Sequence, residues 1–281
     1  MQIKKNNLET IGVDKMYTPW KPDTIDVYGR KINSSIVNKI RTQFDVSLLG
    51  SIVVCDVSEE VDTGAKYEII DGNHRIHAIR NLFGVDVEVE VQVLEYMEEK
   101  DRASMFLRLN ANRSRVGSVD SFRAGLIAGH QNEQEIWDIL QRRGLKVKGL
   151  SPRSWPYVNG LQDVYQIFTK DKRPNGVLDL TIHVLIAAYE DASNKERTKT
   201  FNRECMRMVS GFLFKTIHNP LLNIKRLIDT IRKHDSVTWA RRYGGAIEFH
   251  EKLKGEAKWV TGGYVTLQEE YNKRLSEKNQ L

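Results

Sequence analysis

The chain has 281 residues, 40% of them hydrophobic, which is enough for one large domain or two ordinary ones. It has no run of about eighteen apolar residues and no apolar signal segment at its start, which argues against membrane-spanning and secreted proteins. The two cysteines, Cys55 and Cys205, form no CxxC pair. We therefore expect a cytoplasmic protein with neither a disulfide framework nor a cysteine zinc site.

The charge is unevenly distributed along the chain. Residues 1–120 hold 16 Lys and Arg against 19 Asp and Glu, a balance of −3, whereas residues 121–281 hold 27 against 18, a balance of +9. A basic half of this kind suits a polyanion such as nucleic acid. A solvated helical surface would give the same excess, so charge alone leaves both interpretations open.

Residues 1–24 read as an irregular N-terminal arm that ends in "TPWKPD". After the arm, hydrophobic periodicity and turn residues predict a mixed segment of helices and strands. The predicted elements are a helix at 34–44, strands at 50–57 and 67–70, a helix at 72–83 closed by Gly84, a strand at 85–96 and a helix at 98–110.

From Val119 onward the pattern predicts only helices, followed by a polar tail at 265–281 that we expect to fray. The change from a mixed to a helical pattern coincides with the change in the sign of the charge. The predicted fold class is therefore α+β, with an N-terminal α/β domain at 25–118 and an all-helical, basic domain at 119–264.

The strand "YEII" runs directly into "DGNHR", residues 71–75, where the next helix starts. Helix starts expose unpaired N–H groups, and a glycine there admits a ligand close to the backbone. With Arg75 as a second donor, the segment is a candidate phosphate site. Asp71 would cap the helix or hold a metal, and an ordinary capped helix start is the alternative. His74 and His77 lack a third ligand nearby and are weak metal candidates.

Three motifs together resemble the ParB/sulfiredoxin superfamily, most closely its DGQHR-like branch found in phages and mobile elements. "LLGSIVV" is similar to the "GLLQPIVV" segment of ParB proteins, "IIDGNHRIHAIR" is similar to "LIAGERRWRAA", and "LNANR" is similar to "ENxxR". The resemblance covers roughly residues 25–125. It implies a nucleotide-binding cleft for CTP or ATP with Mg²⁺. Asn110 and Asp71 would contact the metal, and the nucleotide would contact Gly72, Asn73, His74, Arg75, Asn110 and Arg113.

Two departures from the family narrow the chemistry. Asn73 stands where sulfiredoxins have their reactive cysteine, which excludes thiol chemistry at that position. Leu109 stands where ParB has the glutamate needed for nucleotide hydrolysis, so binding without turnover is favoured. A kinase branch with a similar "DGHHR" keeps phosphotransfer open, with Asp71, His74 and Arg75 as catalytic residues. A ParB-like nuclease is a further alternative, but Asp86, Glu88 and Glu90 are better explained as a solvated strand face.

The helical half has basic residues where ParB has its helix-turn-helix, although Pro152 and Pro156 interrupt that segment. The candidate phosphate-backbone contacts are Arg142, Arg143, Lys146, Lys148 and Arg153. The leading hypothesis is a nucleotide- and magnesium-dependent phage-type protein acting on or along DNA, with enzymatic turnover left undecided and a homodimer left open. The rivals are a phosphotransferase or nuclease, and a protein-binding module without turnover.

Overall fold

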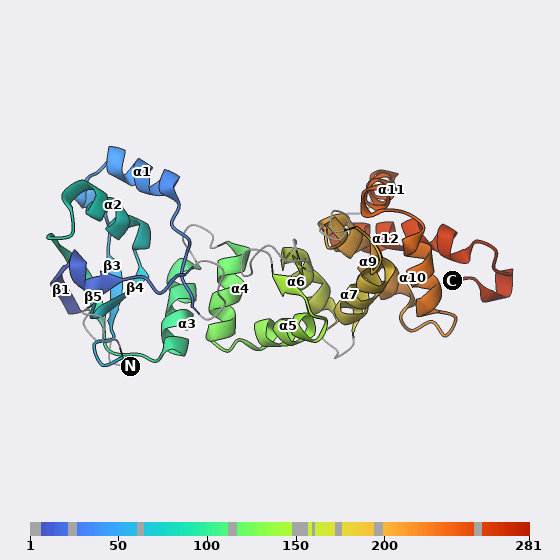
Figure 1. Cartoon of the computed structure of the whole chain (residues 1–281), viewed down its shortest axis with the longest axis horizontal. Helices are drawn as coiled ribbons and strands as arrows, with labels where there is room; N and C mark the ends of the chain where they lie inside the picture. Colours follow the sequence, from blue (N-terminus) through green and yellow to red (C-terminus); the bar gives the residue numbers. More distant parts are fainter. Residues whose placement is uncertain are drawn as a thin grey trace. The chain divides into compact units, whose positions relative to one another are not determined.

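The computed structural model describes residues 7–21, 27–60, 65–111, 117–147, 157–158, 161–171, 176–193, 199–249 and 255–281. The chain forms two compact units, Met1–Gln134 and Glu135–Leu281 (Figure 1). The first contains a mixed sheet with helices and the second is mainly helical, so the predicted α/β part and helical part are confirmed. None of the described helices is both long and apolar enough to cross a membrane.

A five-stranded sheet forms the centre of the first unit, with strand order β1-β5-β3-β4-β2. Its strands are β1 (Asn7–Gly12), β2 (Met16–Tyr17), β3 (Ile52–Asp56), β4 (Tyr67–Asp71) and β5 (Glu88–Leu94). β3 and β4 pair antiparallel, with Cys55 opposite Glu68, whereas β3 and β5 pair parallel. Valines and isoleucines on both faces of β3 and β4 favour this buried position, because such strands pack against helices on two sides.

Helices cover both faces of this sheet (Figure 1). The helices of the first unit are α1 (Ser34–Thr42), α2 (Asn73–Phe83), α3 (Glu99–Asn110) and α4 (Ser118–Ile127), and α5 (Gln131–Arg142) begins at its end. Ile76 and Ile79 of α2 pack with Ile69 on one face of the sheet. Phe106 of α3 and Ala124 of α4 pack around Ile70 on the other face. Successive side chains of β4 thus point to opposite faces of the sheet and belong to two separate hydrophobic cores.

The N-terminal arm expected at residues 1–24 is largely ordered secondary structure. β1 pairs antiparallel with β5, and β2 pairs parallel with β4. Arg80 of α2 donates to the main-chain oxygens of Val13 and Met16, at 2.8 and 2.6 Å. The expectation of an irregular arm was therefore wrong for residues 7–17, while residues 1–6 and 22–26 lie outside the described part.

The fold also places α4 with the first unit, although the sequence pattern assigned residues 119–127 to the helical domain. α4 packs against α3, and Ala124 and Ala128 join the core around Ile70. The buried Arg123 lies over the ring of Trp20, 5.9 Å from its centroid. The compact units consequently part after Gln134 rather than near residue 118.

The second unit is built from helices around α9. They are α6 (Leu161–Lys170), α7 (Val177–Ala188), α9 (Arg203–Thr216), α10 (Ile224–Arg232), α11 (Ser236–Phe249) and α12 (Gly255–Asn272). α9 and α12 pack closely because both carry glycine where they meet: a Cβ on Gly263 would lie 2.5 Å from the main-chain oxygen of Met208. Larger residues at this crossing would push the two helices apart.

Two expectations for this half were wrong. The segment is not exclusively helical, because Lys146–Val147 (β6) and Tyr157–Val158 (β7) form a short parallel pair. The polar tail at 265–281 is also not frayed. α12 continues to Asn272. The side chain of Asn272 donates from Nδ2 to the main-chain oxygen of Leu281 and accepts the N–H of Leu281 at Oδ1, both at 2.9 Å. The polar residues of the tail therefore serve as local hydrogen-bond partners.

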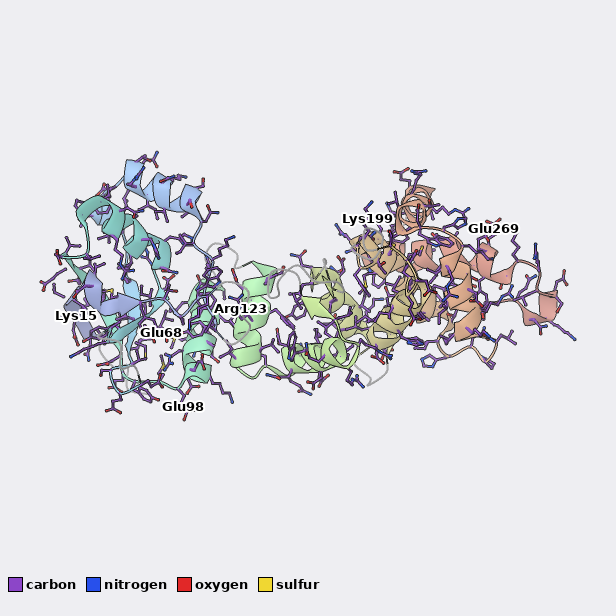
Figure 2. All side chains as sticks on the ribbon, viewed as in Figure 1. Lys15, Glu68, Glu98, Arg123, Lys199 and Glu269 are labelled. Carbon is purple, nitrogen blue, oxygen red and sulfur yellow. The ribbon has the colours of Figure 1, made fainter. Side chains whose placement is uncertain are left out.

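A buried polar network lies between β4 and α3 in the first unit. Glu68, which is labelled in Figure 2, is 3% exposed. It accepts from Tyr17 at 2.9 Å, from Tyr28, and from Nε of Arg102 at 3.0 Å. Arg102 also pairs with Glu60 at 2.9 Å. Burial of the ring and the nearby Glu68 carboxylate raise the pKa of Tyr28, which keeps its hydroxyl protonated as a donor. Glu68 is thus a buried carboxylate whose charge is fully partnered.

Candidate functional site

The candidate site is built at the junction of β4 and α2. Gly72 is the N-cap of α2 with φ +109°, a left-handed conformation that glycine adopts without strain. Its carbonyl accepts the N–H groups of Arg75 and Ile76 at 2.9 and 3.0 Å, so the helix starts on Gly72 itself. The N–H groups of Asn73 and His74 come before any intrahelical acceptor and form the positive end of the helix.

Gly72 is also required by space. A Cβ at this position would lie 3.1 Å from Cγ1 of Ile52 and 3.2 Å from Nη2 of Arg75. Any other residue would therefore combine backbone strain with a small shift of the Ile52 or Arg75 side chain. The predicted role of this glycine, a close approach of a ligand to the backbone, stays a prediction.

A pocket of about 90 Å³ opens at this junction. It brings together segments that are far apart in the sequence, from Thr18, which follows β2, to Asn110 at the end of α3. Its lining residues are Thr18, Gly29, Arg30, Ile69, Ile70, Asp71, Gly72, Asn73, His74, Arg75, Phe106 and Asn110. The structure thus places Asn110 with the whole Asp71–Arg75 segment, as the candidate site requires, whereas Arg113 lies outside the described residues.

Arg75 is held in place beside the start of α2 by two contacts. Its Nη1 donates to the main-chain oxygen of Leu49 at 2.6 Å, and its Nη2 pairs with Asp71 at 2.9 Å. The side chains of Arg75 and Asp71 are 18% and 14% exposed, so the pair is largely withdrawn from water. Asp71 therefore orients Arg75 in this state, while the N-cap position of α2 is taken by Gly72.

Arg30 is the site residue that sequence reasoning missed. Its Nη2 donates to Oδ1 of Asn110 at 2.7 Å, across 80 positions of the chain. Nδ2 of Asn110 donates to the main-chain oxygen of Phe106 at 2.7 Å, which fixes the amide and hence the guanidinium. Burial raises the pKa of Asp120 on α4, and the charges of Arg123 and Arg30 oppose that rise. Asp120 is thus a second charge that faces Arg30.

His74 is held as a neutral acceptor. Its Nε2 accepts the N–H of Asn33 at 3.0 Å, and the side chain of Asn33 in turn caps α1. Burial, together with the nearby charges of Arg30 and His77, lowers the pKa of His74. The neutral ring that accepts at Nε2 carries its proton on Nδ1. His74 therefore connects the start of α2 to the start of α1 and, in this state, is not a free base.

Asn73 leaves one buried oxygen unpaired in the pocket wall. Its Nδ2 donates to Oγ1 of Thr18 at 3.1 Å, whereas its buried Oδ1 has no hydrogen-bond partner among the described residues. An acceptor in this position suits a ligand donor, such as a hydroxyl or a metal-bound water. Thr18 is a second lining residue that sequence reasoning missed.

These residues fit phosphate groups well and a complete nucleotide only in part. Arg30, Arg75 and the start of α2 offer positive charge, against the carboxylate of Asp71 in the pocket lining and that of Asp120, which interacts with Arg30. The volume of about 90 Å³ is well below the roughly 300 Å³ at which small-molecule sites begin, so a base and ribose would lie outside this pocket. For Mg²⁺, the candidate oxygens are those of Asp71 and Asn110, which in this state bond to the guanidinium groups of Arg75 and Arg30. The described residues contain no group of three His, Cys, Asp or Glu suited to a metal. A magnesium ion here would depend on phosphate oxygens and water.

The predicted nucleic-acid residues of the helical half differ in their surroundings. Arg142 is exposed, but Arg143 pairs bidentately with the buried Asp179 at 2.9 and 2.7 Å. The Asp179 carboxylate raises the pKa of Arg143, against the effect of burial. The structure therefore gives Arg143 a role in the fold. Lys146 lies in β6, while Lys148 and Arg153 lie outside the described residues.

Comparisons with known proteins add no family assignment to this geometry. No protein-family model matches the chain, and no curated protein is significantly similar to it. The resemblance to the ParB/sulfiredoxin superfamily therefore stays a prediction from three sequence motifs.

Proposed function

We propose that this chain is a ParB-like nucleotide-binding protein of the phage or mobile-element type that acts on or along DNA. The observation that carries the proposal is the pocket itself. Two motifs 38 positions apart, represented by Gly72 and Asn110, line one small cavity together with Arg30 and Arg75. Oriented guanidinium groups beside a helix start form a recognised arrangement for phosphate.

In this proposal the phosphates lie against the leading N–H groups of α2, with Arg30 and Arg75 as donors. Asp71 and Asn110 would hold a magnesium ion together with phosphate oxygens, and that ion would neutralise phosphate charge. The base and ribose extend from the pocket, since its volume of about 90 Å³ has no room for them. A cytoplasmic location belongs to the same proposal, supported by two buried cysteines that form no disulfide.

Nucleotide binding without hydrolysis is favoured over turnover by the side chains at the pocket. Leu109 packs against the core around Ile70 and offers no group that could orient water. The phosphotransferase and nuclease alternatives require His74 to leave its present partner, Asn33. Asp71 pairs with Arg75 in this state, so any version with magnesium requires the carboxylate to be shared with that guanidinium. No described contact favours those alternatives.

Calorimetric titration of ATP, CTP, GTP and UTP with Mg²⁺ tests the proposal. We expect one nucleotide to bind the wild type and to bind Arg30→Gln about 10- to 100-fold more weakly, because a hydrogen bond to a charged group contributes about 1.5–3 kcal/mol. Arg41→Gln is the matched control, since it removes the same charge from an exposed site on α1. Absence of binding to the wild type, or equal binding to Arg30→Gln, would overturn the proposal.

A further inference from the structure

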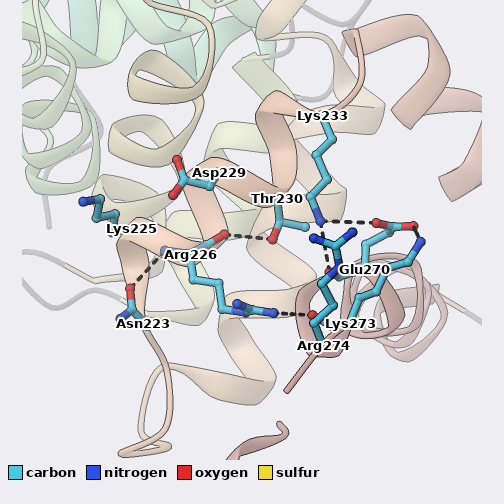
Figure 3. A pocket seen from close by; sticks show the side chains of 9 residues that line it. All are labelled: Asn223, Lys225, Arg226, Asp229, Thr230, Lys233, Glu270, Lys273 and Arg274. Atoms are coloured by element: carbon cyan, nitrogen blue, oxygen red, sulfur yellow. Dashed lines mark hydrogen bonds and ion pairs between the residues drawn. The ribbon is translucent and has the colours of Figure 1, made fainter. Parts of the chain in front are cut away.

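A second basic pocket lies in the second unit, between α10 and the C-terminal end of α12. Its volume is about 560 Å³, several times that of the pocket at Gly72. The lining side chains come from both helices and from the turns that flank them (Figure 3). They are Asn223, Lys225, Arg226, Asp229, Thr230, Lys233, Glu270, Lys273 and Arg274.

The walls of this pocket are fixed by hydrogen bonds between the two helices. Arg226 donates to the main-chain oxygens of Tyr271 and Lys273, both at 2.6 Å, and its guanidinium lies 5.5 Å from the Tyr271 ring centroid. The hydroxyl of Tyr271 accepts the N–H of Asn223 at 2.7 Å. The pocket is therefore a defined feature of the fold, and the charge of Arg226 is directed toward the end of α12.

Positive charge exceeds negative charge in this pocket. Among the described residues, five cationic side chains line it and two carboxylates, those of Asp229 and Glu270. Glu270 is shared between Lys233 and Lys273, at 3.4 and 3.5 Å. One carboxylate therefore cannot neutralise both lysines, and Figure 3 shows their ammonium groups on either side of it.

Two further cations at the pocket have no carboxylate partner among the residues that the structure describes. Neither Lys225 nor Arg274 forms an ion pair within the described part of the chain, and both side chains are exposed. Arg274 follows α12 with φ +67°, the only described non-glycine residue with a positive φ. Lys225 lies in the first turn of α10, on another side of the pocket. The uncompensated charge thus comes from two separate elements.

We propose that this pocket binds phosphates of a nucleic-acid backbone, an inference that rests on DNA as the partner of the proposed function. Separated cations on long, exposed side chains suit a row of phosphates, for which no fixed geometry is needed. The surrounding unit favours a polyanion, because Glu135–Leu281 holds 26 Lys and Arg against 17 Asp and Glu, a balance of +9. The site is distinct from the basic segment 142–153 that the sequence indicated.

The test is fluorescence anisotropy of a labelled DNA duplex over a range of salt concentrations. The variant carries Lys225→Gln with Arg274→Gln, and the matched control carries Lys39→Gln with Lys215→Gln, two exposed lysines outside the pocket. For the variant we expect affinity to fall about tenfold near 0.15 M salt, and the slope of log K against log salt to fall by about two. The control should bind like the wild type.

Three outcomes would overturn the inference in distinguishable ways. A pocket variant that binds duplex like the wild type overturns this location alone and leaves DNA as a partner. A wild type that binds no duplex overturns DNA as a partner as well, while nucleotide binding at the Gly72 pocket is tested separately by calorimetry. Displacement of the duplex by inorganic phosphate at constant ionic strength would show a site for the free ion, and would overturn the assignment to a polymer.

Discussion

The two basic pockets of this chain hold their cations in opposite ways. At the start of α2, Arg30 and Arg75 are oriented by Asn110 and Asp71 around a volume of about 90 Å³. Between α10 and α12, Lys225 and Arg274 extend without ion pairs in the described structure, at the edge of a pocket of about 560 Å³. A small pocket with fixed donors can select a ligand by shape, whereas a larger one with exposed, unpaired cations attracts by charge.

The difference has a consequence for salt dependence. Buried or partly buried charges are screened little by dissolved ions, so the pocket at Gly72 should keep most of its affinity as salt rises. The exposed pocket of the second unit should lose affinity steeply, because binding there depends on counterion release.

The largest effect is expected from a change in the buried polar network of Glu68, between β4 and α3. Arg102→Ala leaves the buried carboxylate of Glu68 without its cation, and loss of one partner of a buried ion pair costs about 3–5 kcal/mol. Chemical denaturation should show a decrease of that size in the free energy of unfolding. Arg108→Ala, an exposed change on the same helix, should stay within about 0.5 kcal/mol. A similar small effect for Arg102→Ala would contradict the description of Glu68 as a buried carboxylate that depends on Arg102 for its charge partner.

An intermediate loss of stability is expected for one of two neighbouring arginines in the second unit, Arg143, and almost none for the other, Arg142. Arg143→Ala should destabilise the protein by about 1–3 kcal/mol, because it removes the partner of the buried Asp179. Arg142→Ala, at an exposed site, should change stability by less than about 0.5 kcal/mol. Thermal unfolding measures both. Loss of DNA affinity in Arg143→Ala at unchanged stability would contradict its role in the fold and support the prediction from the sequence that it contacts nucleic acid.

The smallest effect is a pH dependence of the first unit. Burial is the first cause that lowers the pKa of both His74 and His77 below 6.5, aided by nearby cationic groups. The unfolded chain then binds more protons than the folded chain in the window below pH 6.5, so stability should fall as the pH falls through it. Denaturation at a series of pH values should show a shallower decline for His74→Gln. An unchanged decline would contradict the environment described for His74.

Much of the first unit could be predicted because its patterns are local. The helix 72–83 and its closing glycine agree with α2 and with Gly84, whose φ is +85°. β1 could not be recognised, since most of its residues are exposed and only pairing with β5 makes it a strand. Tertiary hydrogen bonding, which leaves no local pattern, decided the conformation of this segment.

The candidate site was predictable only where a motif marks it. The Asp71–Arg75 segment and Asn110 carry such motifs, and the structure brings them together. Arg30 has no such mark, because its significance comes from a hydrogen bond to Asn110, 80 positions away. Arg143 shows the converse: a basic side chain in a sequence does not reveal that a buried aspartate 36 positions later will bind it.

Hydrogen exchange of the full chain, with and without the nucleotide and Mg²⁺, measures whether phosphate binds at the start of α2. We expect slower amide exchange in peptides that cover residues 71–76, where the leading N–H groups of α2 would meet phosphate, and no change in peptides that cover residues 223–233. Unchanged exchange at 71–76, or protection confined to 223–233, would contradict the assignment of the phosphate site to the start of α2.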